Sequence, residues 1–178
     1  VTTTDELIPS GETSSFRSNP IGLAEFTLSR KDPAYVGRAK EVKKAEEARV
    51  AGNCPAEAFP ELKPVMDKIK ESYKISRDTI AIGWANIANE YATKRYRSNL
   101  INWGMLPFII KDGELPFANG DYIFVPGIVD AIRNKDDVIK AYVVGDSLKE
   151  FELTVGDLTD DERQIILDGC LINFYRNN

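Results

Sequence analysis

Apolar side chains recur at helical spacing in several parts of this chain. Val65, Met66 and Ile69, for example, fall on one face of a helix. Other segments are rich in residues that favour helices and poor in β-branched side chains. Together, spacing and composition predict helices over 34–50, within 55–73 (best defined from 64), and over 92–103, 126–134 and 163–167.

Two of these helices carry recognisable capping residues. Pro33 is typical of a first helical turn, with Asp32 as the N-cap, and Gly52 is typical of a stop. Thr159 and Glu162 have the spacing of a capping box, in which each side chain accepts a hydrogen bond from the backbone N–H of the other residue. We therefore expect Asp32 and Thr159 to cap their helices.

Short apolar or alternating runs predict strands. They lie near 5–8 and over 79–82, 84–91, 106–110, 122–125, 138–144 and 150–155. The last two should form an antiparallel pair, because Gly145 and Asp146 make a turn between them. The order of elements indicates a mixed α/β fold in which helices face a sheet.

The predicted strands at 79–82 and 84–91 are separated by Gly83 alone. Parallel neighbours need a crossover of about a dozen residues or more, and none is present. One continuous strand would far exceed the usual ~5–6 residues, although a bulge at Gly83 would permit it. We therefore expect that a loop or helix is absent here. Three explanations are open, namely that this segment is mobile and was left out, that it was deleted, or that it was lost naturally.

The length of 178 residues predicts a single domain over 1–178 with one filled core. The net charge of −5 disfavours a nucleic-acid surface, which is usually basic. No apolar run approaches the ~20 residues of a membrane span. The N-terminus lacks the pattern of a signal peptide, so we expect a cytoplasmic protein without a membrane partner.

The chain contains no histidine, which removes the commonest general base and the commonest zinc ligand. Ser–His and Cys–His nucleophile pairs are therefore excluded within this chain. Cys54 and Cys170 are too few for an iron–sulfur cluster, which usually takes about three or four thiolates. Catalysis by this chain alone would need carboxylates, Lys, Tyr, Ser or Arg.

Three segments together resemble one known family. They are Thr3-Thr4-Asp5 with Gly11 and Phe16-Arg17, residues 84–108, and residues 162–173. In these segments the chain resembles the C-terminal swivel domain of the aconitase family, closest to the branch described as hydratases. The strand–helix–strand segment at 84–108 is the most specific feature, and residues 36–78 match poorly. The resemblance implies a three-layer β/β/α swivelling domain that is a fragment of a larger hydratase.

Enzymes of this family remove and re-add water on hydroxy-polycarboxylic acids. The resemblance therefore implies a lyase of tricarboxylic acid metabolism, with the particular acid left open. In the family a [4Fe–4S] cluster, held by cysteines of other domains, acts on the substrate hydroxyl as a Lewis acid. The expected partners are those cluster-bearing domains, fused or as a separate subunit, and the substrate. No cofactor or metal is expected in this chain itself.

Two residues match functional positions of the family. Arg17 matches the arginine that binds a substrate carboxylate, a task that suits a planar fork of donors. Asp5, twelve positions earlier, matches an active-site aspartate that would support this region by an ion pair or hydrogen bond. Spacing alone would favour plainer interpretations, namely a solvated loop arginine and a residue of an N-terminal turn.

The catalytic serine of the family has no counterpart here. In the family it lies in a Gly-Ser-Ser/Ala-Arg turn that opens a helix, at the place of the bare junction between Gly83 and Trp84. Ser76-Arg77-Asp78 imitates that turn but precedes a strand, so we interpret it as a decoy. The isolated chain is therefore expected to be catalytically inactive.

Two alternatives remain open. Iron regulatory proteins share this architecture and bind RNA, although the acidic balance argues against such a role here. A regulatory or interaction domain that retained only the fold is the other alternative. Near the most specific segment, we interpret the cations Lys94, Arg95 and Arg97 as solvated and the aromatic residues Tyr91, Tyr96, Trp103 and Phe108 as core.

Overall fold

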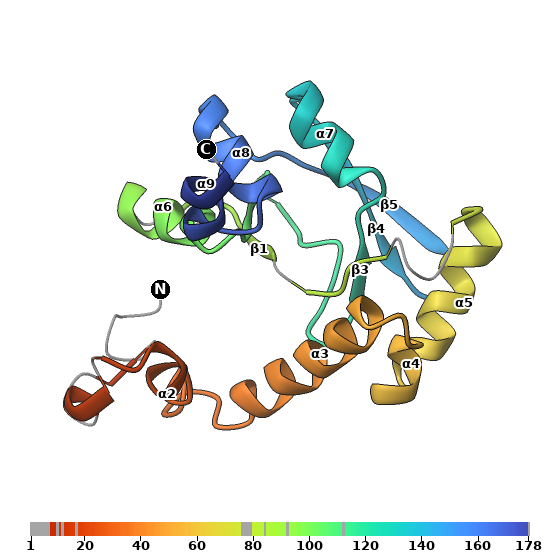
Figure 1. Ribbon diagram of the computed structural model, residues 1–178. Coiled ribbons are helices and arrows are strands. Elements are labelled where there is room, and N and C mark those ends of the chain that lie inside the picture. Colours follow the sequence, from red (N-terminus) through yellow and green to blue (C-terminus); the bar gives the residue numbers. More distant parts are fainter. Residues whose placement is uncertain are drawn as a thin grey trace. The chain divides into compact units, whose positions relative to one another are not determined.

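The structure is a computed structural model that describes residues 8–9, 11, 13–16, 18–75, 80–83, 85–91, 93–111 and 113–177. These residues form a mixed α/β protein, as the sequence predicts (Figure 1). The chain divides into two compact units, Val1–Lys63 with Ile75–Gly83 and Pro64–Lys74 with Trp84–Asn178. Each unit is described by itself. The single domain and the three-layer arrangement stay predictions.

The described part of the first unit is helical. Its elements are η1 (Ser14–Phe16), α2 (Pro20–Ala24), α3 (Tyr35–Val50) and α4 (Pro55–Ala58). Helix α3 confirms the prediction for 34–50. The predicted cap is wrong, because Ala34 occupies the N-cap position without a side-chain hydrogen bond. The Asp32 carboxylate instead pairs with the Arg38 guanidinium, a stronger hydrogen-bond donor than a backbone N–H.

The strand predicted just before Gly83 is wrong for its described residues, 80–82, which belong to no strand. Gly83 has a φ of 98°, which interrupts an extended chain, so the continuous strand is excluded as well. The N–H of Ile82 donates instead to the Glu46 carboxylate on α3 at 3.0 Å. Glu46 also pairs with Arg49 at 2.7 Å, and its side chain is only 14% exposed. A side chain thus takes the backbone donor that a sheet would have used.

The second unit contains two small sheets among its described residues. In one, β1 (Ala85–Ala88) and β2 (Leu106–Ile109) pair in parallel with Ile87 opposite Phe108, and α6 (Lys94–Asn102) connects them. In the other, β3 (Tyr122–Phe124), β4 (Ile139–Val144) and β5 (Leu148–Leu153) are antiparallel in the order 3-4-5. The predicted elements that these confirm, with ends shifted by a few residues, are 84–91, 92–103, 106–110, 122–125, 138–144 and 150–155.

A short bridge joins the two sheets at the end of β2. The N–H of Ile109 donates to the carbonyl of Thr154 at 2.7 Å, and the N–H of Thr154 donates back at 2.9 Å. β2 therefore has β1 on one edge and the chain after β5 on the other. This arrangement places the buried face of both sheets over one core.

The remaining helices are α5 (Leu62–Ser72), which begins in the first unit, α7 (Ile128–Asn134), α8 (Asp160–Leu167) and α9 (Leu171–Asn177). The capping box is confirmed, with Glu162 N–H donating to Thr159 Oγ1 at 3.2 Å and Thr159 N–H donating to Glu162 Oε2 at 2.9 Å. In the second unit, α6 lies beside α8 and α9 (Figure 1). No helix in the described part of the chain is long and apolar enough to cross a membrane.

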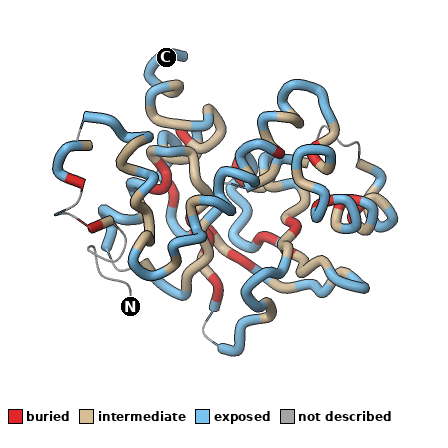
Figure 2. Tube along the Cα trace, turned by 90° about the horizontal axis from the view of Figure 1, so that it is seen from below, coloured by how far each residue is buried: buried red, intermediate tan, exposed pale blue. Residues whose placement is uncertain are grey.

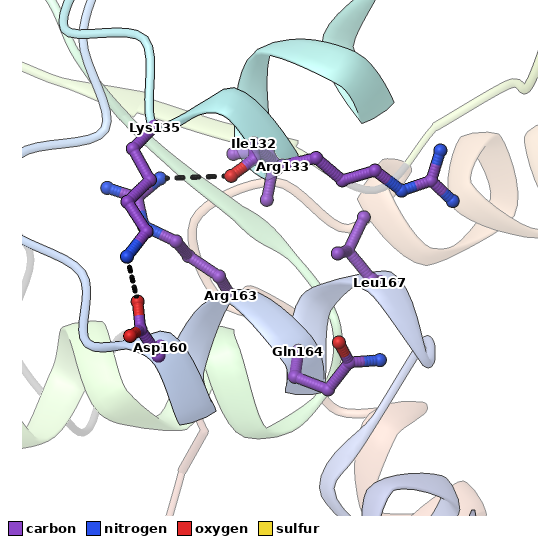
Figure 3. Close-up of a pocket in the computed structure, with 7 residues that line it drawn as sticks. All are labelled: Ile132, Arg133, Lys135, Asp160, Arg163, Gln164 and Leu167. Atoms are coloured by element: carbon purple, nitrogen blue, oxygen red, sulfur yellow. Dashed lines mark hydrogen bonds and ion pairs between the residues drawn. The ribbon is translucent and has the colours of Figure 1, made fainter.

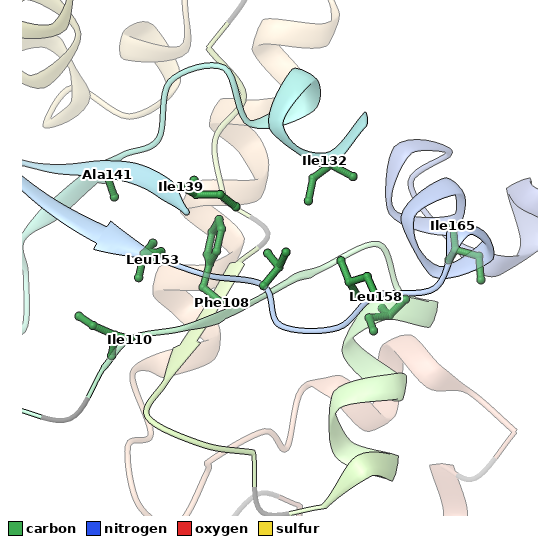
Figure 4. Packing of buried hydrophobic residues seen from close by; sticks show 10 residues of the cluster. Phe108, Ile110, Ile132, Ile139, Ala141, Leu153, Leu158 and Ile165 are labelled. Atoms are coloured by element: carbon green, nitrogen blue, oxygen red, sulfur yellow. The ribbon is translucent and has the colours of Figure 1, made fainter. Parts of the chain in front are cut away.

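The core of the second unit gathers around Phe108, which is 1% exposed (Figure 4). Ile132 from α7 and Leu153 from β5 pack into the same cluster. Figure 2 shows such buried positions as short stretches between exposed ones. Among the expected core aromatics, Phe108 is confirmed, whereas Trp103 is wrong because it is 64% exposed. Other members of the cluster are Ile101, Ile110, Ile139, Ala141, Val155, Leu158 and Ile165.

Two glycines let α6 end against the turn between α8 and α9. Gly104 has a φ of 72°, and a Cβ atom there would stand 1.8 Å from the carbonyl oxygen of Gly169. Since the obstacle is backbone, it cannot rotate aside. This contact therefore requires glycine at position 104 for space as well as for conformation.

Replacing Glu46 tests the anchor of residues 80–83. Glu46→Ala should destabilise the protein by about 1–3 kcal/mol, because the Ile82 N–H loses its acceptor. Urea denaturation followed by circular dichroism measures the loss. The control is Glu47→Ala in the same helix. Glu47 is 63% exposed, and its ion pair with Lys43 is long, at 3.6 Å. It should cost no more than about 0.5 kcal/mol. Equal losses in the two variants would mean that the anchor contributes nothing.

Replacing Gly104 tests the helix contact. Gly104→Ala should cost about 3 kcal/mol or more, because it adds a steric clash to an unfavourable φ. The matched control is Gly120→Ala, where φ is 97° but nothing lies within 4 Å. That variant should cost only about 1 kcal/mol. Thermal denaturation of both variants checks the difference, and a Gly104→Ala protein as stable as Gly120→Ala would contradict the close contact.

Candidate functional site

The residues that the family resemblance singles out lie outside the described residues. This holds for Asp5, Arg17 and the Ser76-Arg77-Asp78 stretch. It holds also for Trp84, so the junction between Gly83 and Trp84 lies outside the described residues as well. The roles assigned to these residues stay predictions.

The residues on either side of Arg17 make local hydrogen bonds. The buried hydroxyl of Thr13 donates to the Pro9 carbonyl at 3.0 Å. The N–H of Phe16 donates to the Thr13 carbonyl at 3.0 Å, which closes η1. The Asn19 side chain then caps α2 by accepting from the Gly22 N–H at 2.9 Å. In the sequence, Arg17 thus falls between two short helical elements that are held by their own residues.

The ring of Phe16 helps to hold these two elements together. It lies 5.2 Å from the ring of Phe26, centroid to centroid. A Cβ atom on Gly22 would stand 2.8 Å from Phe16 Cδ1 and 2.9 Å from Asn19 Nδ2. Glycine at position 22 thus permits both the ring contact and the cap. This role of Gly22 could not be predicted from the sequence, because glycine within a helix indicates only a low helix propensity.

The carboxyl ends of parallel strands often bind ligands, which makes this end of the β1–β2 pair a candidate site. Tyr91 follows β1, and its hydroxyl lies 2.8 Å from the Phe108 carbonyl and 3.2 Å from that of Asn86. Burial, with a smaller effect of Tyr96, raises the pKa of Tyr91 to about 12. The hydroxyl has one proton and holds two strands together, so this edge offers a structural bond rather than a free catalytic group.

One of the basic residues of α6, Arg97, also has a structural role. Arg97 Nη2 donates to the carbonyls of Val155 and Asp157, each at 2.8 Å. The expectation of a solvated Arg97 is therefore wrong, because the guanidinium reaches the turn after β5. Lys94 and Arg95 are exposed, as expected.

A depression of about 180 Å³ lies between α7 and α8 (Figure 3). Lys135 follows α7 directly, and its Nζ lies 2.6 Å from Asp160 Oδ1 on α8. This hydrogen bond lowers the pKa of Asp160. The lining residues are Ile132, Arg133, Lys135, Asp160, Arg163, Gln164 and Leu167.

Arginine donors add to the positive charge of this depression. Arg163 Nη1 donates to the Ile132 carbonyl at 3.3 Å, whereas its buried Nε has no hydrogen-bond partner. Arg133 lies 3.6 Å from Asp130 on its own helix. Three cations thus face one lining carboxylate, Asp160. Sequence reasoning missed this site, because its residues come from two helices far apart in the chain.

The described residues do not fit a metal centre. They contain no group of three or more His, Cys, Asp or Glu side chains that could hold a metal ion. The two free cysteines, Cys54 and Cys170, belong to different units. No chemical step in this chain is therefore derived through an iron–sulfur cluster.

Comparison with family models, with curated proteins and with solved structures finds no match.

The raised pKa of Tyr91 predicts an alkaline loss of stability. Its folded pKa of about 12 lies above the ordinary value of 10.0. The folded state thus favours the protonated hydroxyl, and this contribution is complete below pH ~10 and lost as the pH rises towards ~12. An absorbance titration should show late phenolates for Tyr91 and for Tyr142, whose pKa is raised by its hydrogen bonds with Tyr73 and Glu150, and Tyr91→Phe should remove one of them. The control Tyr175→Phe, at a position 72% exposed, should leave both late phenolates in place. Loss of a late phenolate in the control alone would contradict the assignment.

Proposed function

We propose that this chain is the swivel domain of an aconitase-type hydro-lyase, which binds the carboxylates of a hydroxy-polycarboxylic acid. The observation that carries the proposal is the segment with the most specific resemblance. It implies a strand, a helix and a strand, and the same residues form β1, α6 and β2 with the two strands parallel. Parallel pairing across a connecting helix is what that motif requires.

The C-terminal part supports the same assignment. The resemblance over 162–173 concerns a terminal helix, and α8 (Asp160–Leu167) begins there with its capping box. Its Ile165 is 6% exposed and belongs to the core around Phe108. The segments that carry the resemblance in the second unit thus pack in one core.

The role proposed for Arg17 is to bind a substrate carboxylate. A guanidinium can offer two parallel N–H donors to a carboxylate, and such charge-assisted hydrogen bonds are stronger than neutral ones. The neighbouring turns at Thr13 and Asn19 are held by hydrogen bonds of 3.0 and 2.9 Å. Asp5 is proposed to support this region by an ion pair or hydrogen bond.

This role makes the chain one component of a cytoplasmic enzyme. The cluster that the family uses would be held by other domains, fused or separate, since this chain has only two cysteines. The serine turn of the family would belong at Gly83, whose φ of 98° is typical of a turn rather than of a strand. The isolated chain should therefore bind a substrate without converting it.

The decisive measurement is binding of citrate and isocitrate to the isolated chain, by calorimetry at constant ionic strength. Arg17→Gln should weaken binding about tenfold or more, because it removes a charge-assisted hydrogen bond worth about 1.5–3 kcal/mol. The control Arg38→Gln removes an arginine of the same unit that is 58% exposed and paired with Asp32. It should leave the affinity unchanged.

Two results would contradict the proposal. One is equal affinity in Arg17→Gln and the unmodified chain for every hydroxy-polycarboxylate tested. The other is dehydration of citrate or isocitrate by the isolated chain, because such turnover would need a base and a Lewis acid within these residues.

A further inference from the structure

We propose that the depression between α7 and α8, whose lining residues do not include Arg17, binds a small oxyanion, namely a phosphate or carboxylate group. Its four ionisable lining residues are Arg133, Lys135, Asp160 and Arg163, which together carry an excess of positive charge. The whole chain has a net charge of −5, so this excess is local. The proposal is independent of the hydro-lyase assignment.

The side chains surround the hollow from different directions. Figure 3 shows the head groups of Lys135 and Arg163 on one side, with Arg133 extending on the other. Ile132, which is 1% exposed, and Leu167 supply apolar surface between them. An anion between these groups would meet donors from both helices and an apolar wall that lowers the competition from water.

Arg163 has unused hydrogen-bonding capacity. Its only described hydrogen bond is the 3.3 Å contact from Nη1 to the Ile132 carbonyl, and its buried Nε has no partner. Buried donors are nearly always paired, since an unpaired one loses its hydration without compensation. An oxyanion oxygen would supply the missing acceptor once the Arg163 side chain turned its Nε towards the depression.

Lys135 occupies a backbone position that is unusual for lysine. It follows the last turn of α7 with a φ of 62°, in the left-handed region that glycine or asparagine usually fills. A lysine here costs conformational free energy that glycine would avoid. That cost is understandable if the ammonium group, which reaches the depression, has a use of its own.

Asp160 is the group that an anion would have to displace. Its 2.6 Å pair with Lys135 is solvent-accessible, with side chains 79% and 58% exposed. Exposed pairs of this kind are weak, so Asp160 acts as an exchangeable partner for Lys135. The Asp130 partner of Arg133 is likewise distant, at 3.6 Å, and exposed.

The size of the hollow limits the ligand. Its volume of about 180 Å³ is below the ~300–1,000 Å³ of pockets that enclose whole small molecules. A single phosphate or carboxylate group fits such a space. The remainder of any larger ligand would stay in solvent.

The test is an NMR titration of the isotope-labelled full chain with inorganic phosphate and, separately, acetate. Ionic strength is held constant with sodium chloride. Saturable shifts are expected at residues 132–135 and 160–167. Preference for one of the two anions identifies the group. If neither anion gives saturable shifts, or if chloride gives the same shifts, the proposal is overturned.

Three variants separate binding from folding. Lys135→Gly should weaken anion binding about tenfold without lowering the melting temperature, because glycine suits the left-handed conformation. Asp160→Asn should strengthen binding, since it removes the competing charge. The control Lys140→Gln disrupts another exposed ion pair of this unit, in which Lys140 lies 3.2 Å from Glu150. It should change neither the anion affinity of the depression nor the melting temperature.

A purely structural Lys135–Asp160 pair predicts the opposite pattern. In that case Lys135→Gly and Asp160→Asn would both lose stability, and neither would alter anion binding. That result would overturn the proposal. Arg17→Gln should leave the shifts at 132–135 and 160–167 intact, so failure of the hydro-lyase proposal and failure of this one are distinguishable.

Discussion

The pairing of strand β2 on both of its edges is the constraint on which the second unit depends. β2 pairs in parallel with β1 along four residues, and its last residue, Ile109, bridges to Thr154 beyond β5. Its Phe108 is 1% exposed and lies in the core, while the Phe108 carbonyl accepts the Tyr91 hydroxyl at 2.8 Å. Without β2, the parallel pair and the antiparallel sheet would have no shared hydrogen bonds and no common core. The segment on which the proposed swivel-domain assignment depends is therefore also the structural centre of this unit.

Much of the secondary structure could be predicted, because it is decided by local physics. Composition and apolar patterning identified α3, α6 and the strands β1 to β5 to within a few residues. The Thr159–Glu162 capping box was predictable because both of its hydrogen bonds lie within one turn of helix. The antiparallel β4–β5 pair followed from the short turn between its strands.

Two wrong predictions share a different cause, because in each an ionic or long-range partner replaced the local one. Asp32 pairs with Arg38 instead of capping α3. Residues 80–82 lie against α3 through Glu46, a partner 36 positions away from Ile82, rather than in a strand. The depression between α7 and α8 was invisible in the sequence for the same reason, because only the fold brings Lys135 to Asp160. The functional residues taken from the resemblance, Arg17 and Asp5, lie outside the described residues and stay predictions.

Both proposals concern anions, although the chain has a net charge of −5. Salt screens the charge of the whole chain beyond ~8 Å under physiological conditions, so the nearest donors decide whether an anion binds. The two sites meet this demand in different ways. The hollow between α7 and α8 already combines cations from two helices with the buried Nε of Arg163. Arg17 would bind a carboxylate more strongly once water is excluded, because ion pairs in solvent are weak. A swivel domain gains that exclusion by closing on a partner, so the other domains should add to the affinity that Arg17 gives the isolated chain, whereas affinity at the hollow should not depend on them.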